Sequence, residues 1–145
     1  MLVRQASLSD LNAIAAILGN NKLPSEDCHD HIDHFIILEI DGKIAGIGGL
    51  EYHGIYALLR SIVIITDKRN RGLGKTIIRK LVDQARDNGV TTLYLLTEDA
   101  SDYFATSGFT CIDRTDVPLP IRQTRQFSSL CPTTATVMAM DVACP

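Results

Sequence analysis

A turn rich in glycine and basic residues stands between a run of apolar residues and an amphipathic stretch. Residues 69–76 read Arg-Asn-Arg-Gly-Leu-Gly-Lys-Thr. If a helix begins here, its first backbone N–H groups are unpaired and carry partial positive charge, which attracts phosphate. The two glycines leave room for an anion, and Arg69, Arg71 and Lys75 add positive charge. The turn is therefore predicted to bind phosphate; an ordinary solvated helix start is the alternative.

Two common phosphate-binding motifs do not fit this turn. A Walker A loop needs a glycine where this chain has Arg69. A dinucleotide-binding fingerprint needs glycine or alanine where the chain has Ile77. The turn must therefore belong to another class of phosphate site.

Three polar side chains stand beside or inside apolar runs. Glu51 ends a glycine-rich run and His53 follows two residues later, and each side chain can accept a proton. Arg60 is a charge within an apolar run, and such a charge is rarely left unpaired. It should either clamp a carboxylate of a bound molecule or pair with an internal acid.

A second polar group lies near residue 30. It contains residues of the types that bind zinc, namely Cys28, His29, His31 and His34. Because their spacing matches no established zinc site, we interpret the segment as a solvated polar loop and predict no metal.

The elements that must position these groups follow from the pattern of apolar residues. Residues 57–65 are apolar except at two positions, which is typical of a strand buried on both faces. From Leu73 to Ala85 an apolar residue recurs at every fourth position, which predicts a half-buried helix directly after the basic turn. Gly89 is predicted to end that helix as a left-handed cap.

The remaining elements are a mixture of strands and helices. Ser9 and Asp10 are predicted to cap the first helix, and Asp41-Gly42 is a strong hairpin signal. Glycines at 46, 48 and 49 mark a bend or the close approach of another group. Strands are predicted over residues 2–5, 35–40, 44–50, 91–97, 109–114 and 135–142, and helices over residues 11–18 and 99–107, with a short one within residues 22–34.

Composition narrows the class of protein. The chain has 145 residues, 46% of them hydrophobic and 21% charged, as expected of one globular domain spanning residues 1–145. A net charge of −3 argues against nucleic acid or an acidic membrane surface as the main partner. The first residues resemble no signal peptide and no apolar run is long enough for a membrane span, so we expect a cytoplasmic protein.

Two segments resemble the GNAT acetyltransferase superfamily. Arg69-x-x-Gly72-x-Gly74, between a strand and a helix, resembles its acyl-CoA pyrophosphate loop, and residues 102–109, Asp-Tyr-Phe-Ala-Thr-Ser-Gly-Phe, resemble its aromatic-x-x-x-Gly-Phe segment. The resemblance implies an α/β (α+β) fold with about four helices. Its mixed, mostly antiparallel sheet would have about seven strands, splayed between the fourth and fifth. The resemblance also implies that acetyl-CoA is bound by Ile62, Val63, Ile64, Arg69, Asn70, Arg71, Gly72, Leu73, Gly74, Lys75 and Thr76.

The resemblance further implies direct N-acetylation of a small amine. A free aliphatic amine is almost wholly ammonium near pH 7, so a proton acceptor is needed: Glu51 is the first candidate, directly or through water, and His53 the second. Many members use a tyrosine as general acid at the position that is Phe104 here. The neighbouring Tyr103 is the remaining candidate, although it is turned by about 100° on a helix. A noncatalytic CoA-binding or metalloid-responsive module is the alternative function.

A narrower resemblance concerns the acceptor. Residues 23–27, 57–61 and above all 126–132 are similar to small acetyltransferases associated with arsenic resistance operons. This implies an amino-acid-like arsenical or phosphinate antibiotic as the acceptor class. The long connection over residues 115–134 is predicted to cover the acceptor mouth, with Arg122 or Arg125 binding an anionic group. A contact between two copies of the chain, giving a homodimer, is the alternative.

Overall fold

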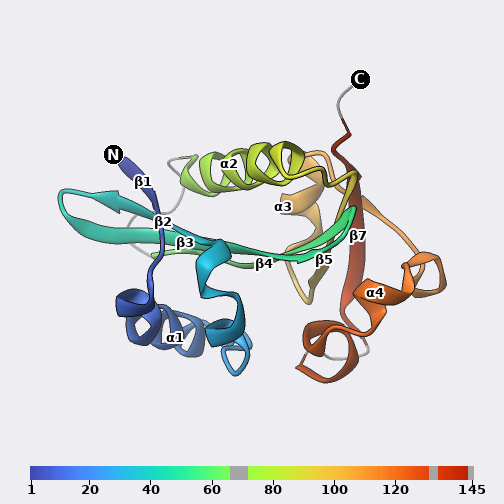
Figure 1. Ribbon diagram of the computed structural model, residues 1–145, viewed down its shortest axis with the longest axis horizontal. Helices are drawn as coiled ribbons and strands as arrows, with labels where there is room; N and C mark the ends of the chain where they lie inside the picture. The colour runs from blue at the N-terminus through green and yellow to red at the C-terminus, as the bar shows by residue number, and fades with distance from the viewer. Residues whose placement is uncertain (66–71, 131–133, 144–145) are drawn as a thin grey trace. The chain divides into compact units, whose positions relative to one another are not determined.

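The computed structural model describes residues 1–65, 72–130 and 134–143 of the chain (Figure 1). Seven strands form one sheet in the order β1-β2-β3-β4-β5-β7-β6. Their bounds are β1 Leu2–Gln5, β2 Phe35–Ile40, β3 Lys43–His53, β4 Tyr56–Ile64, β5 Thr92–Thr97, β6 Thr110–Cys111 and β7 Thr136–Asp141. The α-helices of the described chain are α1 Leu11–Asn20, α2 Leu73–Asp87, α3 Ser101–Thr106 and α4 Leu119–Arg122.

Strand directions make the sheet mixed and mostly antiparallel. β1 with β2, β2 with β3, β5 with β7 and β6 with β7 pair antiparallel. β4 and β5 pair parallel, over Tyr56–Leu58 and Thr92–Tyr94. A helical connection through α2 makes this parallel pair possible, because parallel neighbours need a long crossover. The predicted sheet class is confirmed.

The chain divides into two compact units that each combine two segments. Unit 1 contains Met1–Glu51 and Arg60–Leu81, and unit 2 contains Tyr52–Leu59 and Val82–Pro145. Unit 1 is built on apolar side chains of α1, β2 and β3, among them Ile14, Leu18, Phe35, Ile37 and Ile47. Unit 2 has a separate apolar cluster made by Leu58, Tyr94, Val117, Ile121 and Val137. The prediction of a single domain over residues 1–145 stays a prediction.

The glycines of β3 allow close packing on both faces of the strand. A Cβ atom on Gly48 would lie 2.7 Å from Ile77 Cγ2 of α2, and one on Gly49 would lie 2.7 Å from Phe35 Cε1. Because successive residues of a strand face opposite sides, Gly48 receives α2 while Ile47 faces the side of α1 (Figure 1). The predicted close approach is confirmed, and it brings α2 down onto β3.

Turn and cap predictions are confirmed at two positions. Asp41 and Gly42 have φ angles of 53° and 75°, as a tight hairpin turn with two left-handed residues requires. Gly89 has φ 84° directly after α2, as expected of a left-handed cap.

Two local predictions hold only in part. Asp10 is the N-cap residue of α1, as predicted, but its side chain makes no capping hydrogen bond to that helix. Leu8–Asp10 form a 3₁₀ turn, and the Asp10 carboxylate accepts the Ser7 N–H at 2.8 Å. Arg4 also donates to Asp10, and these hydrogen bonds lower the pKa of that carboxyl to about 2. The strand predicted over residues 109–114 is only Thr110–Cys111, because the chain turns into a 3₁₀ helix at Arg114–Asp116.

The described part of the long connection between β6 and β7 is largely helical. It contains the 3₁₀ turn at Arg114–Asp116, helix α4 and a π-helical turn at Gln126–Leu130. Ile121 is fully buried in the cluster of unit 2, and Phe127 packs against that cluster. These apolar residues therefore pack the connection into the core of unit 2. In the part of the chain that is described, no helix combines the length and the apolar character needed to cross a membrane.

Candidate active site

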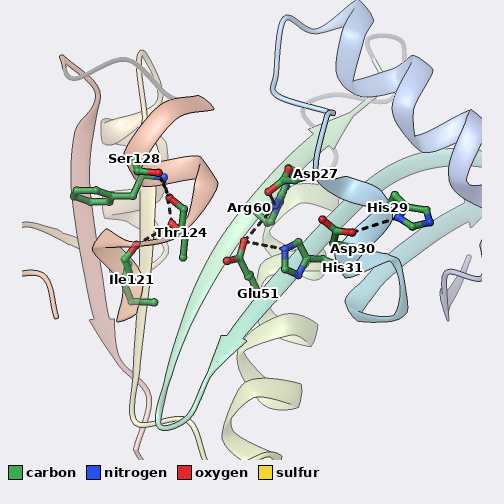
Figure 2. A network of polar contacts seen from close by, with 11 residues as sticks. Asp27, His29, Asp30, His31, Glu51, Arg60, Ile121, Thr124 and Ser128 are labelled. Atoms are coloured by element: carbon green, nitrogen blue, oxygen red, sulfur yellow. Dashed lines mark hydrogen bonds and ion pairs between the residues drawn. The ribbon is translucent and has the colours of Figure 1, made fainter. Parts of the chain in front are cut away.

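Four ionisable side chains meet inside unit 1 (Figure 2). Glu51 lies near the end of β3 and Arg60 lies in β4. Asp27 immediately precedes the 3₁₀ helix η2, Cys28–His34, and His31 lies within it. We refer to Asp27, His31, Glu51 and Arg60 as the buried charge cluster.

Arg60 and Asp27 form the tightest pair of the cluster. The two terminal guanidinium nitrogens donate to the two carboxylate oxygens at 2.6 and 2.5 Å. Both side chains are only 1% exposed. The Arg60 guanidinium also lies 5.8 Å from the centre of the Phe35 ring, and its Nε donates to Ser61 Oγ at 3.2 Å. Arg60 therefore pairs with an internal acid, which is one of the two roles that the sequence left open for it.

Glu51 is held at one oxygen by two neighbours. Its Oε1 accepts a hydrogen bond from Arg60 at 3.4 Å and lies 3.3 Å from His31 Nε2. The Glu51 side chain is 5% exposed, whereas that of His31 is 23% exposed. The carboxylate is thus buried, oriented, and covered on one side by an imidazole that reaches solvent.

Burial lowers the pKa of His31 below its ordinary value, because the imidazolium form loses hydration. Arg60 acts in the same direction, while Glu51, Asp27 and Asp30 oppose it. His31 is therefore neutral at pH 7. If both carboxylates of the cluster are counted as ionised and Arg60 as charged, the cluster carries one net negative charge. This charge favours the binding of a cationic group.

The cluster also has the residue types of a metal site. One ligand atom each from Asp27, His31 and Glu51 lies within 4.8 Å of the others. However, Arg60 already donates to both oxygens of Asp27 and to Glu51. The cation of this site is the guanidinium, so we assign no metal to it.

The zinc-type residues around position 30 are separated by the fold. Cys28 is 2% exposed and belongs to the apolar core of unit 1, and burial raises the pKa of its thiol. His29 is 70% exposed and lies beside Asp30. Only His31 joins the cluster. No local pattern distinguishes His31 from the neighbouring histidines.

The backbone of β4 is unusual next to Arg60. Ser61 has φ 63°, in the left-handed region that side chains other than glycine rarely adopt. Such backbone strain is often found at functional sites. It lies immediately before Ile62–Ile64, the edge predicted to bind the cosubstrate.

The basic turn is described only from Gly72 onward; Arg69, Asn70 and Arg71 lie outside the described residues. Gly72 has φ 72°, and a Cβ atom built there would meet nothing within 4 Å. α2 begins at Leu73, and the N–H and hydroxyl of Thr76 both donate to the Gly72 carbonyl at 3.1 Å. Gly74 is buried and Lys75 is exposed. A glycine-opened helix start is therefore present where the sequence predicted it.

The other predicted site residues lie in unit 2. His53 ends β3 and is half-buried, and Arg122 and Arg125 are exposed. Tyr103 lies on α3 and is 39% exposed, and partial burial raises the pKa of its phenol. Its neighbour Phe104 faces inward, with its ring centre 6.0 Å from that of the buried Phe109. The Tyr103 and Phe104 rings lie edge to face with their centres 5.5 Å apart, and Tyr103 is the more exposed of the two.

Comparison with known proteins gives a consistent result. The profile of the acetyltransferase (GNAT) family matches residues 9–109. An uncharacterised N-acetyltransferase of Chlorobaculum tepidum is 26% identical over 127 residues, which cover 82% of this chain and 81% of the relative. An amino-acid acetyltransferase of Neisseria meningitidis is 25% identical over 125 residues, which cover 80% of this chain but 29% of the relative.

Solved structures share the fold. N-acetylglutamate synthase from Neisseria gonorrhoeae, in complex with coenzyme A and N-acetyl-glutamate, superposes with a TM-score of 0.85 at 22% identity. The match covers 99% of this chain and 35% of the synthase. A Mycobacterium tuberculosis protein in complex with CoA has a TM-score of 0.81 at 22% identity, over 97% of this chain and 99% of that protein.

Proposed function

The chain belongs to the acetyltransferase (GNAT) family, and from this premise we propose that it transfers the acetyl group of acetyl-CoA directly to the amino group of a small molecule. The observation that carries the proposal is the position of Glu51. It is a buried carboxylate, held at one oxygen by Arg60 and His31, at the end of the strand that precedes β4. Such a group is suited to take a proton from an ammonium ion.

The chemistry follows from the groups at hand. Glu51 takes a proton from the acceptor ammonium, directly or through a water molecule, and the neutral amine then attacks the thioester carbon. Backbone N–H groups along Ile62–Ile64 donate to the thioester oxygen as it gains negative charge. The carbon–sulfur bond breaks as the intermediate collapses. Tyr103 is the candidate donor of a proton to the departing thiolate, because burial keeps its phenol protonated. The second proton lost by the nitrogen then restores the phenol of Tyr103.

We propose that the start of α2 binds the pyrophosphate of the cosubstrate. The open space beside Gly72 and the first N–H groups of α2, which have no acceptor within the helix itself, suit an anion. Lys75 supplies an exposed positive charge in the same turn. The sequence places Arg69 and Arg71 immediately before it.

Gly72→Glu is expected to abolish binding of acetyl-CoA, because it puts bulk and negative charge where phosphate belongs. Isothermal calorimetry measures this directly. Gly72→Gln is the matched control: it has the same shape and the same unfavourable φ, so a difference between the two variants reports charge repulsion alone. If Gly72→Glu binds acetyl-CoA as tightly as the unchanged protein, the pyrophosphate is held elsewhere.

We propose an amino-acid-like acceptor, with arsenical or phosphinate antibiotics as the candidate class. The net negative charge of the buried charge cluster favours the ammonium end of such a molecule. An acidic group at the other end needs a separate cation, because Arg60 is already paired with Asp27. The exposed Arg122 and Arg125 are the candidates. Relatives named amino-acid acetyltransferases support this class of acceptor.

Arg122→Ala and Arg125→Ala are each expected to raise the KM for the acceptor while leaving the KM for acetyl-CoA nearly unchanged. A bidentate ion pair with an acidic group would be lost, which weakens acceptor binding by about tenfold or more. Steady-state kinetics with each substrate varied in turn measures both constants. If both stay unchanged while sedimentation shows an altered oligomeric state, the connection is instead a contact between two copies of the chain.

A further inference from the structure

His31 is the most solvent-exposed member of the buried charge cluster. The side chains of Asp27, Glu51 and Arg60 are at most 5% exposed, whereas 23% of the His31 side chain is exposed. A proton from solvent therefore reaches the cluster most easily at this imidazole.

The contact between His31 and Glu51 affects the carboxylate differently in the neutral and the protonated state of His31. A neutral imidazole that carries its proton on Nε2 donates to Glu51 Oε1 across the observed 3.3 Å and fixes the carboxylate. A protonated imidazole adds a full positive charge at the same place, next to the guanidinium of Arg60. A carboxylate facing two cations holds its negative charge more firmly and accepts a proton less readily.

We propose that His31 is a positioning residue that controls the proton-accepting ability of Glu51: neutral His31 orients the base, and protonated His31 switches it off. The proposal rests on the proposed function, since it assigns Glu51 as the base. Besides Glu51, the charged groups that act on His31 are Asp27, Asp30 and Arg60.

The direction of the pH effect follows from the surroundings of His31. Burial lowers the pKa of His31 below its ordinary value of about 6.5, so the imidazole is neutral at pH 7 and gains its proton only in more acidic solution. Acetyl transfer should therefore lose its base only as the pH falls through the lowered pKa of His31. Deprotonation of the acceptor amine also depends on pH, but it affects every variant equally and cancels in a ratio of rates.

The test compares His31→Gln with His29→Gln. A glutamine N–H can still reach Glu51 but gains no charge, so His31→Gln is expected to lower kcat/KM at pH 8 by about 2–10-fold, the cost of a weakened hydrogen bond. The ratio of its kcat/KM to that of the unchanged protein should then rise at least threefold between pH 8 and one pH unit below the His31 pKa that NMR measures. His29 is an exposed histidine of the same 3₁₀ helix, and the ratio for His29→Gln should stay flat. A flat ratio for His31→Gln would overturn the proposal.

A second measurement does not depend on activity. The pKa of His31 can be followed by NMR, and Glu51→Gln is expected to lower it further, because the variant removes a negative charge that favours the imidazolium. An unchanged pKa in Glu51→Gln would overturn the coupling. If the NMR result is as expected but the unchanged protein acetylates no amine, the proposed function fails while the contact between the two residues stands.

Discussion

Glu51→Gln is expected to lower kcat/KM for the acceptor amine by roughly 10²-fold or more, because it removes a positioned general base. Glutamine keeps the shape of the side chain and removes its ability to take a proton. The variant should also fold, because Arg60 remains paired with Asp27 through two hydrogen bonds. Steady-state kinetics with acetyl-CoA at saturation gives the rate, and a thermal melt confirms the fold.

The matched control is His53→Gln, since His53 is the second candidate for the base and lies two residues along β3. His53→Gln is expected to leave the pH dependence of kcat/KM unchanged. If His53→Gln instead shows the large loss and Glu51→Gln is unaffected, the role of base belongs to His53.

Arg60→Met is expected to destabilise the protein by about 3–5 kcal/mol, because it leaves Asp27 and Glu51 buried without their cation. Equilibrium unfolding in denaturant measures the loss. Methionine preserves most of the apolar length of the side chain, including its packing near Phe35. The missing charge is therefore the main change.

A double variant separates the charge from the packing. Adding Asp27→Leu to Arg60→Met removes both members of the pair, and an apolar replacement of a buried ion pair is often nearly neutral, so part of the lost stability should return. Asp83→Asn is the surface control: Asp83 pairs with Arg86 at 3.4 Å on exposed side chains, and its loss should cost less than about 1 kcal/mol. An equal cost for Arg60→Met and Asp83→Asn would contradict the structural role of the cluster.

Local patterns in the sequence predicted much of the scaffold, because a strand, a helix or a tight turn depends mainly on the residues within it. The β2 strand, the left-handed turn at Asp41 and Gly42 and the α2 helix each follow from periodicity or from the φ that a turn requires. The length of β6 was overestimated: only two of its residues pair with β7. A run of residues suited to a strand does not show how many of them pair with a neighbouring strand.

The candidate site was predicted less completely because its contacts join distant parts of the chain. The apolar surroundings of Arg60 indicated that a partner must exist, but its main partner, Asp27, is 33 residues away in sequence. In the sequence, His31 was grouped with Cys28 and His29. In the fold, Cys28 lies in the apolar core of unit 1 and His29 is exposed. The left-handed φ of Ser61 was also not foreseen, since serine has no marked preference for that conformation.

Acceptor-dependent thiol release tests the central claim most directly. The unchanged protein is mixed with acetyl-CoA and a panel of primary amines, including amino acids and amino-acid-like arsenicals and phosphinates, and free CoA thiol is measured alongside the mass of the products. The account predicts thiol release above the amine-free background for at least one amine, with a product heavier by one acetyl group. Binding of acetyl-CoA without acceptor-dependent thiol release from any amine would contradict it and would identify a noncatalytic CoA-binding module.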